Sequence, residues 1–178
     1  MAIDLLQIAG AGAVMSGATA MGRAQAARYR RRPEELRELA AALRSVRNDI
    51  SYARLPLGES IRRLTAGGQT KASPVRQLFV DVATHLAKPG VTAQQAFAQA
   101  FSLHVHTLSI TQEDRAVLEA FSRTAGLIGP EEQLGQLDAA LAALADRERE
   151  AVHDRSRYER VFQTTGALIG VLVVILLI

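Results

Sequence analysis

The chain has 178 residues, enough for one domain of ordinary size, and the absence of cysteine excludes disulfides and thiolate metal sites. Aromatic residues make up only 4%, while Ala, Leu and Arg dominate, which argues against a β-rich fold and favours helices. The formal net charge is +3, which permits an anionic membrane or nucleic acid as a partner.

Residues 1–22 are predicted to form an N-terminal transmembrane helix. The stretch is mostly apolar, and about 20 helical residues span the roughly 30 Å hydrocarbon core of a bilayer. A cleaved signal peptide is the alternative, but such a peptide carries positive charge before its apolar stretch. Here Asp4 precedes the stretch and five arginines follow it, which favours an uncleaved anchor: Arg23, Arg28, Arg30, Arg31 and Arg32.

Small residues recur at four-residue steps within this first segment, at Gly12, Ser16 and Ala20. Such spacing allows membrane helices to approach closely, so we predict a packing face here. Its partner could be the second span, another copy of the chain or a different protein. The alternative is that small residues are simply tolerated at these positions.

Residues 23–160 are predicted to form a helical domain. Its first helix is expected to begin at Pro33, because Pro and acids suit a first turn, and to end near Ala53. An apolar residue recurs along it at steps of three and four: Leu36, Leu39, Leu43, Val46 and Ile50. A short helix from Leu57 to about Thr65 is expected after Pro56.

Three helix starts are predicted from capping residues, after a loop at residues 67–73. Ser73, Thr92 and Thr111 each precede an apolar periodic segment and can accept a hydrogen bond from the first turn. The expected apolar faces of the three helices are Val75, Leu78, Phe79, Val82 and Leu86; Ala96, Phe97, Ala100 and Phe101; and Val117, Leu118, Phe121 and Leu127.

A long last helix is predicted from Glu131 onward, with an apolar stripe at Leu134, Leu137, Leu141 and Leu144. No Pro or Gly interrupts residues 136–165, so this helix is expected to continue into residues 161–178. That terminal segment is predicted to be a second transmembrane helix. A buried core helix is the alternative, but no polar face exists from Gly166 onward.

These elements predict an all-α fold, a six-helix antiparallel bundle flanked by an N-terminal and a C-terminal transmembrane helix, because short loops favour antiparallel neighbours. Two spans place both chain ends on one side of the membrane. The arginines of residues 23–32 follow the first span without an acid among them, whereas the flank of the second span is charge-balanced. The positive-inside rule therefore predicts that residues 23–160 lie in the cytoplasm.

No pattern of residues predicts catalysis or a cofactor. His104 and His106 are the close His pair, but no acid or Cys at a suitable spacing completes a metal site. There is no phosphate-binding loop, and the Arg-rich segment lacks the interleaved aromatics of single-strand binders. We expect no small-molecule substrate and no nucleic acid partner. Charge alone marks Arg37, Arg44, Arg47, Arg62 and Arg63 as docking candidates, with a solvated face as the alternative.

Three stretches carry a resemblance to a known family. The most specific is the segment after the first span, with Arg32, Pro33, Leu36, Leu39, Leu43, Ile50, Tyr52, Pro56 and Leu57 at the family's spacing. The others are Gln136 with the charged run 146–152, and the apolar run that ends the chain. On these residues the chain resembles the stage III sporulation protein AB family, with one departure at Gly129, which stands one place late.

The resemblance implies a function. The family is similar to the inner-membrane platform protein of type II secretion and type IV pilus systems, whose cytoplasmic unit is a six-helix bundle. It implies a scaffold in the outer forespore membrane, with the central domain in the mother-cell cytoplasm. The implied partners are membrane lipid, a secretion-type ATPase and other stage III sporulation membrane proteins. The alternatives are a platform-like protein of another secretion or pilus system, and a membrane enzyme or nucleic-acid binder.

Overall fold

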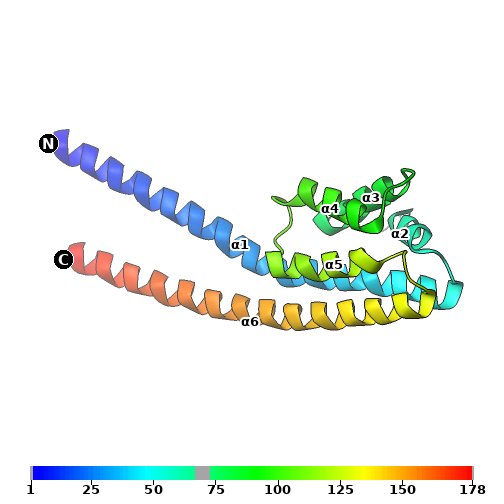
Figure 1. Ribbon diagram of the computed structural model, residues 1–178. Helices are drawn as coiled ribbons and strands as arrows, with labels where there is room; N and C mark the ends of the chain where they lie inside the picture. The colour runs from blue at the N-terminus through cyan, green and yellow to red at the C-terminus, as the bar shows by residue number, and fades with distance from the viewer. Residues whose placement is uncertain (1, 67–72, 178) are drawn as a thin grey trace. The chain divides into compact units, whose positions relative to one another are not determined.

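The computed structural model describes the backbone of residues 2–66 and 73–177 and the side chains of residues 27–66 and 73–158. These residues form six helices and no strand, which confirms the all-α prediction (Figure 1). The helices are α1 (Ala2–Ala53), α2 (Leu57–Ala66), α3 (Pro74–Leu86), α4 (Ala93–His104), α5 (Gln112–Thr124) and α6 (Pro130–Leu177). The chain divides into two compact units, one of residues Arg32–Ala151 and one of Met1–Arg31 with Val152–Ile178.

Local capping starts α3, α4 and α5 where the sequence predicts it. The Ser73 hydroxyl accepts a hydrogen bond from the Arg76 N–H at 3.0 Å. Thr92 and Thr111 each form a reciprocal capping box with the residue three places later. Because the caps satisfy N–H groups that have no partner within the helix, they determine the three starts locally. The rest of the predicted loop, residues 67–72, lies outside the described residues.

The predicted helix start at Pro33 is wrong, because Pro33 lies inside the single 52-residue helix α1. An interior proline removes one backbone hydrogen bond and costs about 3 kcal/mol. Contacts on both sides of it offset this cost, since Arg32 is bound to Asp114 and Leu36 is fully buried. Tertiary packing therefore keeps this segment helical, although Pro33 is equally suited to the first turn of a helix.

The core of the Arg32–Ala151 unit centres on Phe97 of α4, which is fully buried. Its ring meets those of Phe79 and Phe121 edge-on, with centroids 6.2 and 6.4 Å apart. Aromatic pairs favour this geometry. Every helix contributes buried apolar residues, and the predicted stripe of α1 is entirely buried: Leu36, Leu39, Leu43, Val46 and Ile50. In the α6 stripe Leu137 and Leu144 are fully buried and the other two leucines are partly buried.

Leu127 was expected on the apolar face of α5 and is instead 73% exposed. The helix ends at Thr124, and Gly126 then adopts φ +81°, which turns the chain before Leu127. A residue beyond the last turn no longer follows the helical period, so the spacing that places Phe121 in the core does not extend to Leu127.

Within the same unit α1 and α6 run antiparallel. Arg37 of α1 pairs with Glu148 of α6 at 2.6 Å, and Arg47 pairs with Asp138 at 2.5 Å. Ten residues forward along α1 thus correspond to ten residues backward along α6. Both helices rise by about 15 Å over ten residues, so the two ion pairs are equally spaced along each helix. This register agrees with the antiparallel arrangement predicted for the bundle.

In the other unit α1 and α6 also lie side by side where their side chains are described. The rings of Tyr29 and Tyr158 stack with centroids 3.9 Å apart and planes 23° from parallel. In the part of the chain that the structure describes, no helix is both long and apolar enough to cross a membrane. The predicted spans, residues 1–22 and 161–178, fall outside the residues with described side chains, as do Gly12, Ser16 and Ala20.

Candidate functional site

A carboxylate buried between three helices is the most developed polar site in the bundle. The side chain of Asp114 on α5 is 0% exposed. Arg32 of α1 donates to it twice, from Nε to Oδ2 at 2.8 Å and from Nη2 to Oδ1 at 3.0 Å. Arg147 of α6 donates from Nε to Oδ1 at 2.9 Å. We call Arg32, Asp114 and Arg147 the ion cluster.

The start of α5 positions the carboxylate. Asp114 is the third residue of the helix, and its N–H donates to the Thr111 hydroxyl at 3.3 Å. In return the Thr111 N–H donates to Asp114 Oδ2 at 2.9 Å. The same side chain therefore caps its own helix and binds arginines 82 and 33 residues away in the sequence. The positive end of the helix dipole adds to the attraction for a negative charge at this position.

The surroundings of Asp114 keep it ionised. Burial raises its pKa, but hydrogen bonds from Arg32, the Thr111 backbone and Arg147 outweigh this and lower the pKa from 3.8 to about 2. Four N–H donors occupy the two carboxylate oxygens, and a carboxylate offers about four lone-pair sites. At neutral pH both carboxylate oxygens are therefore fully occupied, which suits a structural role rather than an acid–base one.

Further contacts extend the ion cluster toward the surface. Arg147 reaches Glu150 at 2.8 Å and Glu113 at 3.4 Å. Glu35, one turn after Arg32 on α1 and 5% exposed, accepts the Ser109 N–H at 2.6 Å. The segment before α5 and the start of α5 are thus both tied to α1. A satisfied network of buried charges specifies one arrangement of the helices that share it.

The family-motif residues divide into two groups. Seven are buried in the bundle: Arg32, Pro33, Leu36, Leu39, Leu43, Ile50 and Leu57. Tyr52 and Pro56 are exposed, and Tyr52 is 84% exposed. The sequence pattern reveals that Arg32 is distinctive, but it groups Arg32 with the positive cluster after the first span. The structure corrects this, because Arg32 is 5% exposed and bound to Asp114.

Four of the five arginines considered for docking have partners within the chain. Arg37 and Arg47 link α1 to α6, Arg62 pairs with Glu59 at 2.6 Å, and Arg63 lies 3.5 Å from Asp49. Exposed pairs of this kind contribute little to stability and remain available to solvent. Their role in docking stays a prediction.

The two histidines considered for a metal site have different surroundings. His104 is 8% exposed, and its Nε2 lies 2.6 Å from Asp81 Oδ2, so it ties the end of α4 to α3. His106 is exposed. Among the described residues no group of three or more His, Cys, Asp or Glu side chains could hold a metal ion.

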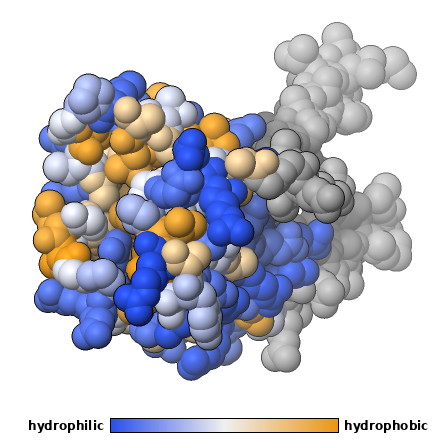
Figure 2. Space-filling view, turned by 90° about the vertical axis from the view of Figure 1, so that its right-hand side faces the viewer, coloured by the Kyte–Doolittle hydropathy of each residue, from blue (hydrophilic) through white to orange (hydrophobic). Residues whose placement is uncertain are grey.

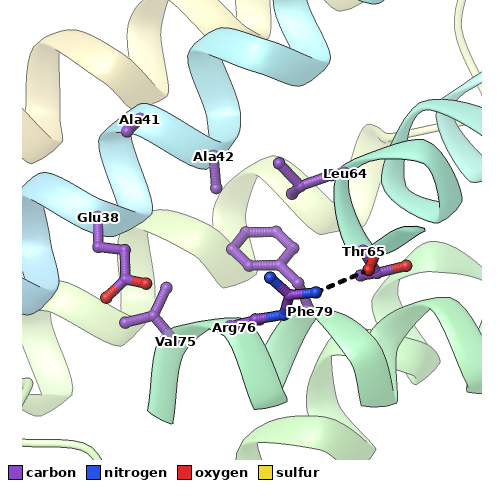
Figure 3. Close-up of a pocket in the computed structure, with 8 residues that line it drawn as sticks. All are labelled: Glu38, Ala41, Ala42, Leu64, Thr65, Val75, Arg76 and Phe79. Carbon is purple, nitrogen blue, oxygen red and sulfur yellow. Dashed lines mark hydrogen bonds between the residues drawn. The ribbon is translucent and has the colours of Figure 1, made fainter. Parts of the chain in front are cut away.

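A small pocket lies between α1, α2 and α3 (Figure 3). It measures about 190 Å³, and Phe79 and Ala42 form part of its apolar wall. Figure 3 shows Arg76 extended across it, with a hydrogen bond of 3.1 Å from Nη2 to the Thr65 carbonyl. At its edge Glu38 accepts a hydrogen bond from the Ser73 hydroxyl. Its volume is below the roughly 300–1,000 Å³ of typical ligand sites.

Sequence reasoning found Arg32 but not its partners. The sequence places Asp114 in the first turn after the Thr111 cap and Arg147 in the charged run 146–152, and neither pattern joins them to Arg32. The local pairs of that run exist, for example Arg149 with Asp146 at 3.1 Å. The available signal was the capping box, which places an acid at the third position but does not identify which arginines reach it.

A family model and a relative of known identity match this chain over nearly all its length, and a solved structure matches most of it. The family model for stage III sporulation protein AB matches residues 7–178. Stage III sporulation protein AB of Bacillus subtilis (strain 168) is 29% identical over 173 residues, which cover 97% of this chain and 99% of that protein. A solved structure of stage III sporulation protein AB is 28% identical with a TM-score of 0.63, and the match covers 71% of this chain and 98% of that one. The chain therefore belongs to the stage III sporulation protein AB family.

Proposed function

We propose that this sporulation protein is a membrane scaffold that docks a cytoplasmic secretion-type ATPase to the other stage III sporulation membrane proteins. Residues 1–22 and 161–178 serve as its two membrane anchors, and residues 23–160 lie in the mother-cell cytoplasm at the outer forespore membrane. The protein acts by binding, without catalysis of its own. The apolar character of both end segments and the arginines after the first support this placement.

The ion cluster is the observation that most favours a scaffold. It joins α1, α5 and α6 through one buried carboxylate, close to the residues where α1 enters and α6 leaves the bundle. Both helices are uninterrupted there, since α1 runs from Ala2 to Ala53 and α6 from Pro130 to Leu177. A force applied to α5 would reach both long helices through Asp114. A scaffold needs such a fixed joint, whereas a carboxylate that takes part in acid–base catalysis needs a free oxygen.

The docking step can be tested with the full chain in lipid nanodiscs. We expect the secretion-type ATPase of the same organism to bind these nanodiscs in biolayer interferometry, and empty nanodiscs to give no signal. The measurement is repeated with the other stage III sporulation membrane proteins present. Absence of binding under both conditions would overturn the docking function.

The orientation can be tested by cysteine labelling, because the natural chain contains no cysteine. Gln99→Cys places a single thiol at an exposed position of α4. In intact cells that express the chain in the plasma membrane before a forespore forms, this thiol should resist a membrane-impermeant maleimide, and it should react after the cells are opened. Labelling in intact cells would contradict the cytoplasmic placement.

The second candidate is a platform-like protein of another secretion or pilus system. The resemblance of the family to platform proteins favours it, but such proteins commonly carry two bundles, and the described part of this chain holds one. Deletion of the gene separates the two candidates. A block in spore formation with normal pili and secretion supports the first, and the reverse phenotype supports the second.

A further inference from the structure

The unit of Met1–Arg31 with Val152–Ile178 has an excess of positive charge where its side chains are described. The only acid among residues 27–31 and 152–158 is Asp154, against five arginines: Arg28, Arg30, Arg31, Arg155 and Arg157. The Arg32–Ala151 unit is balanced, with 14 Lys and Arg against 15 Asp and Glu. Figure 2 faces the end of that unit where α1 ends and α6 begins, and shows hydrophilic side chains dispersed among apolar ones. The positive charge is therefore concentrated beside the two predicted anchors.

A stacked pair of tyrosines defines how α1 and α6 face each other within this unit. The ring centroids of Tyr29 and Tyr158 are 3.9 Å apart, so both side chains point into the contact between the helices. The two helices are antiparallel (Figure 1). Each residue of an α-helix is rotated by about 100° from the residue before it. The side of the helix pair on which a nearby residue lies then follows from its separation in sequence from Tyr29 or Tyr158.

Three arginines lie on the same side of this helix pair. Arg28 precedes Tyr29 by one residue, and Arg157 precedes Tyr158 by one residue. Because the helices are antiparallel, the same backward step of about 100° turns both arginines to one side of the contact. Arg31, three residues after Arg28, is about 60° from it around α1 and lies on that side as well.

These three arginines also lie at similar levels along the helices. The helical rise places them within about 5 Å of one another along the pair. All three side chains are exposed, and none forms an ion pair with another described residue. The nearest described acid on either helix, Asp154, is partly buried and already interacts within the chain. We call Arg28, Arg31 and Arg157 the basic ledge.

The basic ledge has the chemistry of a phosphate site. A guanidinium group is planar, always charged and carries five N–H donors in a geometry that matches phosphate oxygens. Three like charges within a few ångströms along one face repel one another, and an anion bound between them offsets that repulsion. An oxygen-rich anion such as a phosphate group is therefore the ligand that these side chains suit best.

We propose that the basic ledge binds the phosphate headgroup of an anionic phospholipid at the cytoplasmic membrane surface. Arg28 lies six residues, about 9 Å, beyond the first predicted anchor, and Arg157 lies four residues, about 6 Å, before the second. The headgroup layer outside the hydrocarbon core is about 5–7 Å thick. Side chains on a helix tilt toward its N-terminus, so Arg28 and Arg31 lean toward the anchor end of α1.

A lipid fits this position better than a nucleic acid does. The basic ledge adjoins two apolar segments that would hold it at the headgroup level, where a nucleic acid would have to approach an anionic bilayer. The inference rests on the proposed function in one respect, that residues 1–22 and 161–178 anchor the chain in the membrane. It adds to that function a preference for anionic lipid beside the anchors.

The test compares two lipids that differ in charge. The full chain is purified in detergent and titrated with phosphatidylglycerol or phosphatidylcholine, and the bound lipids are counted by native mass spectrometry. We expect phosphatidylglycerol to bind at least about tenfold more tightly, since each arginine near a membrane surface contributes a factor of about five. Millimolar inorganic phosphate should not displace it, because a free phosphate lacks the acyl chains that rest against the anchors.

Two matched variants test the three arginines. Arg28→Gln with Arg31→Gln and Arg157→Gln should bind the two lipids with equal affinity, and glutamine preserves helix propensity. The control makes the same change in net charge at three exposed arginines of the other unit and should keep the preference: Arg44→Gln, Arg54→Gln and Arg123→Gln. Both variants should melt at the temperature of the natural chain, because every substituted side chain is exposed.

Equal affinity of the natural chain for the two lipids overturns the proposal, as does a control variant that loses the preference as fully as the ledge variant. Displacement of phosphatidylglycerol by inorganic phosphate, or tighter binding of a DNA duplex, overturns the assignment to lipid. Incorporation of the chain into nanodiscs of neutral phosphatidylcholine tests the anchors separately. Failure to incorporate refutes the anchors of the proposed function, whereas incorporation without a preference for phosphatidylglycerol refutes only the basic ledge.

Discussion

Arg32 and Asp114 face each other across 82 residues of sequence and are joined by two hydrogen bonds, of 2.8 and 3.0 Å. The side chains are 6% and 0% exposed. Two parallel N–H···O bonds between a guanidinium and a carboxylate specify orientation as well as distance. The start of α5 is therefore held against α1 in a single orientation, and Arg147 extends the same constraint to α6.

Asp114→Asn should destabilise the bundle by about 3 kcal/mol, because it leaves two arginines facing a neutral amide inside the protein. The asparagine side-chain oxygen can still accept the Thr111 N–H, so the change isolates the loss of charge. The measurement is the free energy of unfolding of the full chain in urea, followed by circular dichroism. Asp146→Asn is the control, because the Asp146–Arg149 pair is exposed and should not affect stability. Equal urea midpoints of unfolding for Asp114→Asn and Asp146→Asn would contradict the prediction.

The low pKa of Asp114 predicts a pH dependence of stability. Its pKa is about 2 in the folded protein and 3.8 in the unfolded chain, so the carboxylate stabilises the fold above pH 3.8. This contribution, about 2 kcal/mol, is lost as the pH falls through the folded pKa near 2. The check is the difference in unfolding free energy between the natural chain and Asp114→Asn from pH 6 down to pH 2. A difference that does not change with pH would refute the assignment.

Phe97→Ala should cost about 3–5 kcal/mol, the usual range for removing a buried aromatic ring. Phe97 is fully buried and contacts Phe79 and Phe121. We expect these neighbouring rings to fill only part of the cavity that the substitution leaves. Thermal unfolding of the two chains provides the comparison. Leu103→Ala, on the same helix but 63% exposed, should change the melting temperature little. A small effect at Phe97 would show that the core is not centred there.

The antiparallel register of α1 and α6 can be tested by cross-linking in a chain that has no natural cysteine. Arg47→Cys with Asp138→Cys should be joined by a short bifunctional maleimide, because the natural side chains meet at 2.5 Å. Arg47→Cys with Glu148→Cys should not be joined, since Glu148 lies ten residues, about 15 Å, along α6 from Asp138, the residue that faces Arg47. A shift in the mobility of the denatured chain on gels reports the link. Equal yields for the two pairs would contradict the register.

Helix starts and apolar faces were predictable because their causes are local. The Ser73, Thr92 and Thr111 caps act within three residues of themselves, and the stripe from Leu36 to Ile50 follows the helical period. Where a local signal competes with tertiary packing, the prediction failed. Pro33 with two following acids suits a first turn, yet the helix continues through it because residues on both sides are bound elsewhere.

The sequence by itself determined the all-helical class, the family resemblance and most of the core, because propensity, capping and periodicity depend on neighbours in the chain. Only the tertiary structure decided that Asp114 binds both Arg32 and Arg147, and that the Gln133 side-chain nitrogen is buried with no hydrogen-bond partner among the described residues. The sequence contains several arginines and acids of equal local character. Which of them meet depends on how the helices pack, since burial and hydrogen-bond geometry, rather than charge alone, select the pairs.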